Sequence, residues 1–180
     1  MGPLALLDMI GVDVARHVGE YLYDTYGPRM KPAEILGEVF KAGRYGAKSG
    51  QGFYGQGGRD DDPAIAEMIR RVQEATGIRE TPFHPHRLLL PLINEAAHCL
   101  QEGVATANDI DIAMMAGTGF PQSKGGPLHL ADQLGIDVVL KALEEYRQSL
   151  GPRFWPAPLI RRMAGAGHLG VKAGRGFFTY

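Results

Sequence analysis

The apolar residues of this chain recur at the three- and four-residue spacing of a helix rather than in the alternation of a strand. Over residues 137–150 the apolar side chains form one face, and lysine, glutamate and glutamine form the opposite face. The members of the apolar face are Val139, Ala142, Leu143, Tyr146 and Leu150. Near the N-terminus the same pattern is made by Val14, Val18, Tyr21 and Leu22. The spacing therefore predicts two amphipathic helices.

A different pattern marks residues 86–102, which are apolar almost all round. A helix of that kind is buried on most of its sides, and Pro91 should begin or kink it because proline has no N–H for the helical ladder. Thr106 and Asp109 have the spacing of a capping signal before a further helix that contains Ile110 and Met114. Since alternating strand patterns are nearly absent, the predicted fold class is all-α.

Between these regions the chain has a linker-like segment. The stretch Gly55–Asp62, with its Gly-Gly pair and three consecutive aspartates, is typical of a linker. The residues that follow, 63–76, predict a short helix. Its apolar side consists of Ile65, Met68, Ile69 and Val72.

One internal repeat organises the sequence. Every residue from 2 to 54 corresponds, without a gap, to the residue 124 positions later, and about 20 of these 53 aligned positions are identical. Chance would give roughly one identity in 16 at average residue usage. The identical positions are mostly glycine, proline and aspartate, which fix turns and caps. A period of this length is too long for a solenoid, so we expect two tandem domains packed like a fused dimer.

The two copies are unequal in length. Residues 82–124 have no counterpart, since the first copy would need about 42 residues before Met1. We therefore expect a partial first domain over residues 1–56, a linker with a short helix over 57–81, and a complete second domain over 82–180. A truncated first copy would leave an apolar groove open, so we also expect the chain to associate with itself or with a partner.

The composition and charge of the chain restrict the kinds of partner it can bind and the cellular compartment in which we expect it. The 180 residues carry 19 basic and 20 acidic side chains, which argues against nucleic acid or an anionic membrane because both require a concentrated positive field. The longest apolar run, Leu88–Ile93, is too short to cross a bilayer, and the N-terminus has no secretory signal pattern. The single cysteine, Cys99, lies among aliphatic residues, so no disulfide framework exists. We expect a cytoplasmic protein without a membrane span.

One glycine motif has the spacing of a dinucleotide-binding site. Residues 50–55 match G-x-G-x-x-G, but that fingerprint binds a pyrophosphate only between a strand and a helix N-terminus. Here a helix-like segment precedes it and a polar linker follows, so we favour a turn that folds an aromatic pair onto its helices. Lys48 and Lys172 lie in the two copies of this turn. Phosphate binding is possible for them, and capping of a helix C-terminus is favoured.

The polar residues assemble no complete active site. The six histidines show no metal-ligand spacing, and no metal site is expected. We expect the rings of His84 and His86 to face solvent before the buried helix. Asn94, Glu95 and His98 share one side of that helix, so they either pin it to another helix or contact a ligand. Pinning is the favoured interpretation.

A series of motifs points to a known family. In chain order they are Arg87-Leu-Leu-Leu-Pro-Leu-Ile-Asn-Glu-Ala96, Glu102-Gly-Val, Asp109-Ile-Asp-Ile-Ala113, Gly117-Thr-Gly-Phe-Pro121, Gly126-Pro-Leu, Gly135-Ile-Asp137 and Gly170-Val-Lys-Ala-Gly-Arg-Gly-Phe-Phe. Residues 82–180 thereby resemble the C-terminal domain of 3-hydroxyacyl-CoA dehydrogenases, and residues 1–54 repeat the last half. The resemblance implies a tandem repeat of the helical domain that is similar to the C-terminal domain of 6-phosphogluconate dehydrogenase.

The resemblance also implies roles for particular residues. In the family an asparagine directly before Arg-Leu-Leu lies near the substrate carbonyl, and His86 occupies that position here. The second copy is therefore expected to be a structural partner. The family's Met-Gly-Pro lining near the acyl group matches Met1, Gly2 and Pro3, which are the expected substrate-binding residues. Gly125-Gly126-Pro127 replaces that lining in the second copy.

The implied reaction is oxidation of the 3-hydroxyl of an acyl-CoA to the ketone, with hydride passing to NAD. In the family the general base and the NAD site lie in a Rossmann domain that is not part of this sequence. We therefore expect the C-terminal part of a multifunctional fatty-acid β-oxidation enzyme, inactive alone, whose partners are acyl-CoA, an upstream NAD-binding domain and a second subunit.

Two alternatives stay open. One is a non-catalytic helical dimerisation or assembly module. The other is a dehydrogenase with a similar helical domain that acts on a hydroxy acid without CoA.

Overall fold

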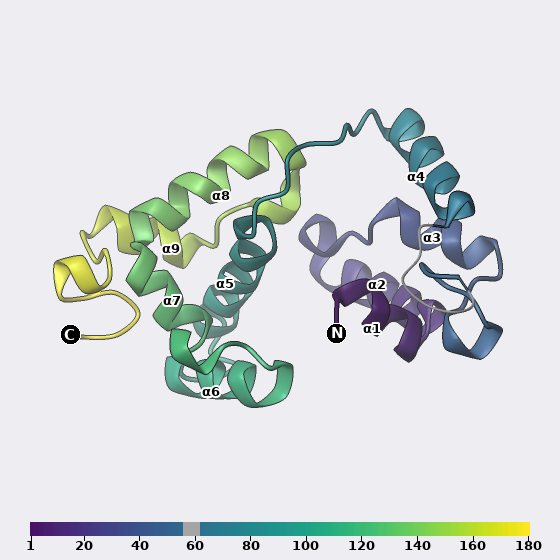
Figure 1. Ribbon diagram of the computed structural model, residues 1–180. Coiled ribbons are helices and arrows are strands. Elements are labelled where there is room, and N and C mark those ends of the chain that lie inside the picture. The colour runs from purple at the N-terminus through teal and green to yellow at the C-terminus, as the bar shows by residue number, and fades with distance from the viewer. Residues whose placement is uncertain (56–61) are drawn as a thin grey trace. The chain divides into compact units, whose positions relative to one another are not determined.

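The computed structural model describes residues 1–55 and 62–180, in which the regular elements are α-helices and short 3₁₀ turns (Figure 1). Extended backbone there is limited to isolated bridges such as the pair Gly46 and Gln51. The predicted all-α class is confirmed. Of the linker-like stretch, residues 56–61 lie outside the described residues. In the described ranges no helix combines the length and the hydropathy needed to span a membrane.

The chain divides into two compact units, Met1–Pro82 and Phe83–Tyr180. The helices of unit 1 are α1 (Pro3–Ile10), α2 (Val12–Tyr26), α3 (Glu34–Lys41) and α4 (Pro63–Thr76), with short 3₁₀ turns η1 (Gly27–Met30) and η2 (Ala47–Ser49). The helices of unit 2 are α5 (His86–Gln101), α6 (Ala107–Thr118), α7 (Pro127–Leu134), α8 (Ile136–Leu150) and α9 (Pro158–Gly165). Its 3₁₀ turns are η3 (Gln122–Lys124), η4 (Pro152–Phe154) and η5 (Val171–Ala173).

The helix boundaries follow the sequence repeat. Helices α7, α8 and α9 begin and end 124 residues after α1, α2 and α3, and η5 stands in the same relation to η2. A single glycine joins the first two helices of each copy: Gly11 lies between α1 and α2, and Gly135 lies between α7 and α8. Both glycines have a positive φ, of 114° and 98°, which explains why this position carries no side chain in either copy.

An aspartate closes each copy of the repeat, and it is buried in unit 2 and half-buried in unit 1. In unit 2 the Asp132 carboxylate on α7 accepts hydrogen bonds from the backbone N–H of Phe177 and of Phe178, both at 2.9 Å. In unit 1, Asp8 on α1 accepts the same bonds from Phe53 and Tyr54 at 2.8 and 2.9 Å. The aspartate therefore folds the glycine turn, with its aromatic pair, back onto the first helix of its unit.

Glycines make room for this contact. A Cβ at Gly176 would lie 2.0 Å from an Asp132 carboxylate oxygen, and a Cβ at Gly52 would lie 2.1 Å from the equivalent oxygen of Asp8. Gly170 and Gly46 would likewise meet the backbone of Asp132 and Asp8, at 2.2 and 2.1 Å. These distances explain why the glycines of the turn recur in both copies.

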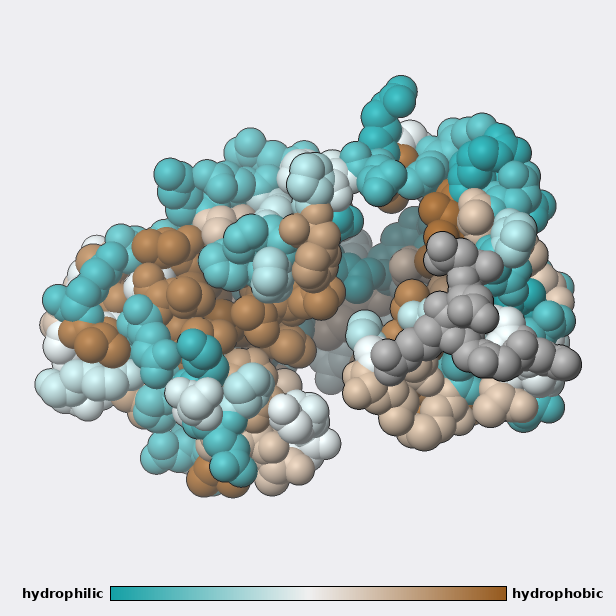
Figure 2. Space-filling model, in the orientation of Figure 1, coloured by the Kyte–Doolittle hydropathy of each residue, from teal (hydrophilic) through white to brown (hydrophobic). Residues whose placement is uncertain are grey.

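Unit 2 is built around α5, the helix that is apolar on most sides. Leu90 and Ile93 are buried against residues of α7, α8 and α9, and hydrophobic residues gather where these four helices meet (Figure 2). The helix begins at His86 and Pro91 lies in its interior, so of the two expected roles Pro91 does not have that of beginning the helix. Burial of Leu90 and Ile93 on either side of the proline offsets the missing backbone hydrogen bond.

Helix α6 follows α5 and starts as expected. The Thr106 hydroxyl accepts a hydrogen bond from the N–H of Asp109 at 3.2 Å, and the Asp109 side chain accepts from the N–H of Thr106. This reciprocal pair is the predicted capping box, and it is confirmed.

Unit 1 has a smaller core, to which α4 belongs. Ile65 and Met68 of α4 are buried beside Val39 of α3 and Phe53 of the glycine turn. The buried Arg44 joins α4 to that turn, since its guanidinium donates to the Gly52 carbonyl at 2.7 Å and to the Asp62 carboxylate at the start of α4. The helix expected over residues 63–76 is present, and it packs against α3 as part of unit 1.

The predicted amphipathic helix near the N-terminus also forms, as α2, but much of its apolar face is exposed. Val14, Val18 and Tyr21 are 42%, 53% and 70% accessible to solvent. The difference from the expectation has a simple cause: the spacing of apolar residues predicts a face, whereas burial needs another element to cover it.

We expect Asp132→Ala to lower the free energy of unfolding by about 2–4 kcal/mol, because it leaves the part-buried backbone N–H groups of Phe177 and Phe178 without an acceptor. Asp8→Ala should destabilise unit 1 in the same way. Thermal and urea unfolding, followed by circular dichroism, measure both effects. Asp24→Ala, which removes an exposed carboxylate of α2, is the control and should change little. Equal stability of Asp132→Ala and the control would contradict this role.

Candidate functional site

The predicted substrate-binding residues lie at the start of α1 in unit 1. Met1 is 78% exposed, Gly2 precedes the helix in an extended conformation, and Pro3 is its first residue. Within the described part of the chain, nothing lies within 4 Å of a Cβ placed on Gly2. The surface around Met1 and Gly2 is therefore open to a ligand or to another part of a protein.

In unit 2 a side chain occupies the equivalent position, at the start of α7. A Cβ at Gly126, the equivalent of Gly2, would lie 2.4 Å from the Asp111 side chain. Asp111 of α6 is 2% exposed and accepts hydrogen bonds from the N–H of Leu128 and of His129, at 2.8 and 3.0 Å. A carboxylate at the positive end of α7 stabilises that helix, so Asp111 closes the position that is open in unit 1.

The His129 ring completes this arrangement. Its Nδ1 lies 2.8 Å from the second Asp111 oxygen, and the ring stacks on Phe178 with 3.8 Å between centroids. Beside it the Tyr180 hydroxyl donates to Asp132 at 3.1 Å, and burial, followed by the charge of Asp132, raises the pKa of Tyr180 to about 12. Sequence reasoning assigned no role to Asp111 or His129, although the glycine shared by positions 2 and 126 was a signal that could have pointed to a close contact here.

His86, at the family's asparagine position, is the first residue of α5 and is half-buried. Its backbone N–H donates to Nδ1 of the exposed His84 at 3.2 Å, and the two rings lie 4.4 Å apart at 68°. His86 belongs to unit 2 and Met1, Gly2 and Pro3 to unit 1, so the structure describes each within its own unit.

Asn94 of α5 pins its helix to the η4–α9 connection. The side chain is 1% exposed, donates to the Trp155 carbonyl at 2.9 Å and accepts from the Ala157 N–H at 2.8 Å. The favoured interpretation, pinning rather than ligand contact, is confirmed for Asn94. His98 lies one turn further along α5, and its Nδ1 is 3.9 Å from a carboxylate oxygen of Glu102. The Asn94 side chain is therefore committed to two backbone groups.

The glycine motif at 50–55 is a structural turn. It follows α3 and η2, no strand precedes it, and the backbone N–H groups of Phe53 and Tyr54 are bonded to Asp8. A pyrophosphate site needs such N–H groups free and aimed at the ligand. The structural interpretation of the motif is confirmed.

Lys48 and Lys172 have a partner that the sequence did not indicate. The Lys48 ammonium donates to the Asp13 carboxylate at 2.6 Å, and Lys172 donates to Asp137 at 2.6 and 2.7 Å. The hydrogen bond from the lysine lowers the pKa of Asp13 and of Asp137 below the usual value. Both lysines thus join the glycine turn of their unit to the first turn of α2 or α8, instead of the expected helix C-terminus.

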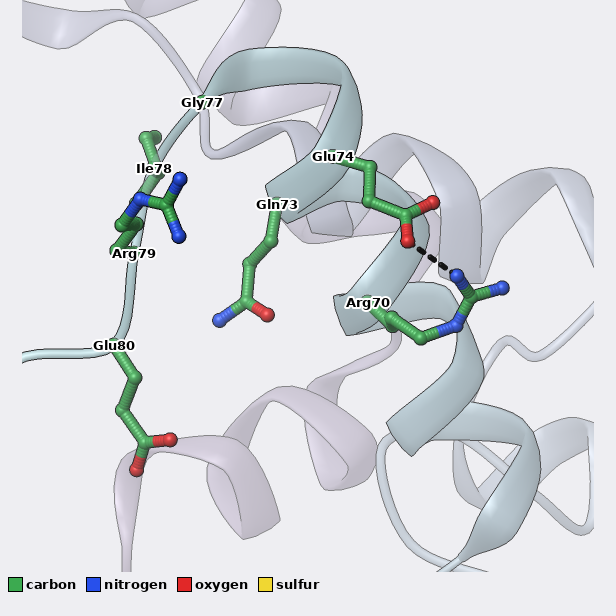
Figure 3. Close-up of a pocket in the computed structure, with 7 residues that line it drawn as sticks. All are labelled: Arg70, Gln73, Glu74, Gly77, Ile78, Arg79 and Glu80. Carbon is green, nitrogen blue, oxygen red and sulfur yellow. Dashed lines mark hydrogen bonds and ion pairs between the residues drawn. The ribbon is translucent and has the colours of Figure 1, made fainter.

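One pocket, of about 340 Å³, lies at the end of α4 (Figure 3). The residues that line it are Arg70, Gln73, Glu74, Gly77, Ile78, Arg79 and Glu80. The guanidinium of Arg70 is bonded to Glu67 and Glu74 of its own helix. None of the predicted site residues lies in this pocket, so it is not a candidate for the substrate site.

Comparison with known proteins establishes the family. The model of the 3-hydroxyacyl-CoA dehydrogenase C-terminal domain matches residues 1–56 and 83–180. This chain belongs to that family. The chain is also 34% identical over 171 residues to the fatty acid oxidation complex subunit alpha of Shewanella sp. strain MR-4, with 91% of this chain and 24% of the relative covered. The corresponding subunit of Vibrio cholerae is 33% identical over 172 residues, covering 93% and 24%.

Solved structures agree with this assignment. The (S)-3-hydroxybutyryl-CoA dehydrogenase of Ralstonia eutropha is 35% identical and superposes with a TM-score of 0.52, covering 68% of this chain and 45% of that one. The 3-hydroxybutyryl-CoA dehydrogenase of Escherichia coli, at 24% identity, shares the fold over 92% of this chain and 51% of its own, with a TM-score of 0.71. The chain spans about a quarter of the length of the curated relatives it matches.

We expect Asn94→Ala to lower the free energy of unfolding by more than ~2 kcal/mol, since each buried backbone group left unpaired costs about 1–3 kcal/mol. Urea unfolding followed by tryptophan fluorescence suits the measurement, because Trp155 is the single tryptophan and its carbonyl is one of the two partners. Gln101→Ala, at the exposed end of the same helix, is the matched control. If the urea midpoint of Asn94→Ala equals that of the wild type, the two hydrogen bonds of Asn94 contribute nothing to the free energy of unfolding.

We expect the stabilisation from Lys48 and Lys172 to depend on pH. Because the folded pKa of Asp13 and Asp137 is depressed, the contribution is present above the unfolded value of 3.8 and is lost as pH falls through the folded pKa. The double variant Lys48→Met, Lys172→Met should therefore melt below the wild type at pH 7, and the two curves should converge near pH 2. Lys141→Met, which removes an exposed lysine of α8, is the control. A gap that is the same size at pH 2 would contradict the assignment.

Proposed function

We propose that this chain is the helical C-terminal part of an NAD-dependent 3-hydroxyacyl-CoA dehydrogenase of fatty-acid β-oxidation. The observation that carries the proposal is the match of one family model to both 1–56 and 83–180. The relatives named as fatty acid oxidation complex subunits support the pathway. Reversible oxidation of a 3-hydroxyacyl-CoA needs a hydride acceptor, and NAD is proposed to bind to another part of the longer protein.

Within that enzyme the proposed role of the chain is to complete the acyl-CoA cleft and to pack against other subunits. Met1, Gly2 and Pro3 are proposed to line the acyl group, which their open position at the start of α1 supports. The equivalent position of unit 2 is occupied by Asp111, and His86 stands where the family has asparagine. Both observations support a structural role for the second copy.

The proposed domain organisation follows the repeat. Residues 1–56 are proposed to be part of one family domain and residues 82–180 a complete second one, with 57–81 as the connection between them. The contacts of α4 with α3 show that most of this connection is packed on unit 1. A cytoplasmic location and self-association remain predictions.

The alternative function is a non-catalytic assembly module. The exposed apolar side chains of α2 in unit 1 favour it, because large exposed apolar patches mark association surfaces. The two functions differ in whether the chain supports turnover when it is joined to a dehydrogenase.

A replacement experiment tests the proposal. In the Shewanella subunit alpha, the segment that aligns with this chain is exchanged for it, and NADH consumption is followed with acetoacetyl-CoA. We expect turnover by the hybrid within about tenfold of the parent, and none by the 180-residue chain alone. A folded hybrid without turnover would support the assembly module instead, and robust turnover by the isolated chain would overturn the proposal.

Two variants of the active hybrid separate the roles of the copies. Met1→Ala should raise KM for acyl-CoA several-fold with a smaller change in kcat, because it removes apolar contact with the acyl group. His86→Asn, which restores the family residue in the second copy, should leave both constants unchanged. A rise in kcat for His86→Asn would show that the second copy takes part in catalysis.

A further inference from the structure

Arg44 is the one charged residue of unit 1 that is buried among the described residues, with 5% of its surface exposed. Its guanidinium donates from Nε to the Gly52 carbonyl at 2.7 Å and from Nη1 to Oε1 of Gln51 at 3.1 Å. The remaining nitrogen, Nη2, donates to Oδ2 of Asp62 at the start of α4. Because the guanidinium is planar, these bonds fix its orientation as well as its place. Arg44 therefore determines where the glycine turn lies against α4.

Helix α1 depends on the same turn for its position. In the described chain none of its residues is buried, and its contribution to the core of unit 1 is the partly buried Leu7. Its polar anchor is Asp8, whose carboxylate accepts hydrogen bonds from the N–H of Phe53 and of Tyr54. A short helix with few buried contacts lies at the low-stability end of a structure, so its place follows that of the turn.

Gly52 links the Arg44 contact to the Asp8 contact. Its carbonyl accepts the hydrogen bond from Arg44, and its Cα lies so close to Asp8 that a Cβ would be 2.1 Å from a carboxylate oxygen. The next two N–H groups of the turn are the ones that bond this carboxylate. Arg44 and Asp8 thus hold the same short segment from two sides, and a shift of the turn at Arg44 is passed on to α1.

Unit 2 holds the equivalent turn in another way. The residue that corresponds to Arg44 is His168, which is half-buried. The Tyr180 hydroxyl instead donates a further hydrogen bond to Asp132, at 3.1 Å. The buried arginine and its bond to α4 are therefore a feature of unit 1, which is the copy that is proposed to line the acyl group.

We propose that Arg44 is a positioning residue for the acyl-CoA substrate: it sets the place of α1, and through α1 that of Met1, against the acyl group. The inference rests on the proposed function, in which Met1 lines that group. Met1 lies about two helical turns before Asp8, directly ahead of the helix that Asp8 anchors. Arg44 does not touch the substrate, and its effect reaches the acyl group through Gly52 and Asp8.

Asp62 allows the Arg44 contact to be weakened without loss of α4. One carboxylate oxygen accepts from Arg44, and the other caps the helix by accepting from the Ala64 N–H at 2.9 Å. Asparagine retains this cap, because its side-chain carbonyl accepts the same bond, and it removes the charge that pairs with Arg44. Asp62→Asn is therefore a second variant with the same expected direction of effect as Arg44→Met, and it carries the test where Arg44→Met does not fold.

Amide hydrogen exchange tests the contact in the 180-residue chain without any turnover. Arg44→Met should raise the exchange rates of the Phe53 and Tyr54 amides about tenfold or more, because the turn that holds them against Asp8 loosens. The Leu6 amide, which donates to the Gly2 carbonyl in the first turn of α1, should exchange faster as well.

Unit 2 provides the internal control for this measurement. The amides of Phe177 and Phe178 make the equivalent bonds to Asp132, and their exchange should not change in Arg44→Met or in Asp62→Asn. Wild-type exchange of the two unit 1 amides, in a variant that is folded by circular dichroism, would overturn the inference whatever the activity of the chain.

The Shewanella hybrid tests the effect on the substrate. Arg44→Met should raise KM for acetoacetyl-CoA about three- to tenfold and leave KM for NADH within about twofold of the parent hybrid. Arg44→Lys, which keeps the charge but not the planar fork, should restore part of the loss. A purely structural defect would lower the amount of active hybrid and leave both KM values unchanged, which would overturn the inference. Glu67→Gln, on the exposed side of α4, is the matched control and should leave all constants unchanged.

A double variant shows whether Arg44 acts through Met1. If it does, KM for acetoacetyl-CoA of Met1→Ala, Arg44→Met should equal that of the poorer single variant within about twofold, because both changes remove the same contact. Multiplied single effects would overturn the inference. Failure of the proposed function is recognised separately: it leaves the hybrid that carries Arg44 without turnover, whereas failure of this inference leaves that hybrid active.

Discussion

The fold of each unit depends on one carboxylate that accepts hydrogen bonds from two backbone N–H groups. Asp132 on α7 and Asp8 on α1 each hold the glycine turn that ends their unit, 45 residues further along the chain. The contact brings Phe177 or Phe53 into the core and requires glycines at 176 and 52, where a side chain would overlap the carboxylate. It therefore explains at once the aspartate, the glycines and the aromatic residue that recur in the two copies.

The two copies have this contact in common and differ in what packs around it. Unit 2 carries α5 and α6, which bury Leu128 and place Asp111 at the start of α7. Unit 1 carries α4, which packs on α3 and is joined to the glycine turn through Arg44. The start of the repeat is thus closed in one unit and open in the other. The proposed substrate-lining role of the first copy and structural role of the second rest on that difference.

Local patterns in the sequence predicted the elements well. Helical spacing located α2, α4, α5 and α8, and the capping box located the start of α6. Comparison of the chain with itself identified the positions that turned out to form the Asp8 and Asp132 contacts. It did not reveal the contacts, because identity between copies shows that a residue is needed without showing its partner. Lys48 illustrates this point: its glycine-rich surroundings suggested a helix cap, whereas its partner Asp13 lies 35 residues away.

The sequence alone determined the helical class, the repeat of 124 residues and the resemblance to dehydrogenase C-terminal domains, because helix periodicity, caps and turn residues are local and survive in both copies. Only the tertiary structure decided which apolar faces are covered. Leu4 and Leu128 are the same residue in the same repeat position, yet one is 40% exposed and the other is fully buried. Burial depends on the elements that pack from elsewhere in the chain, and no local pattern records whether they are present.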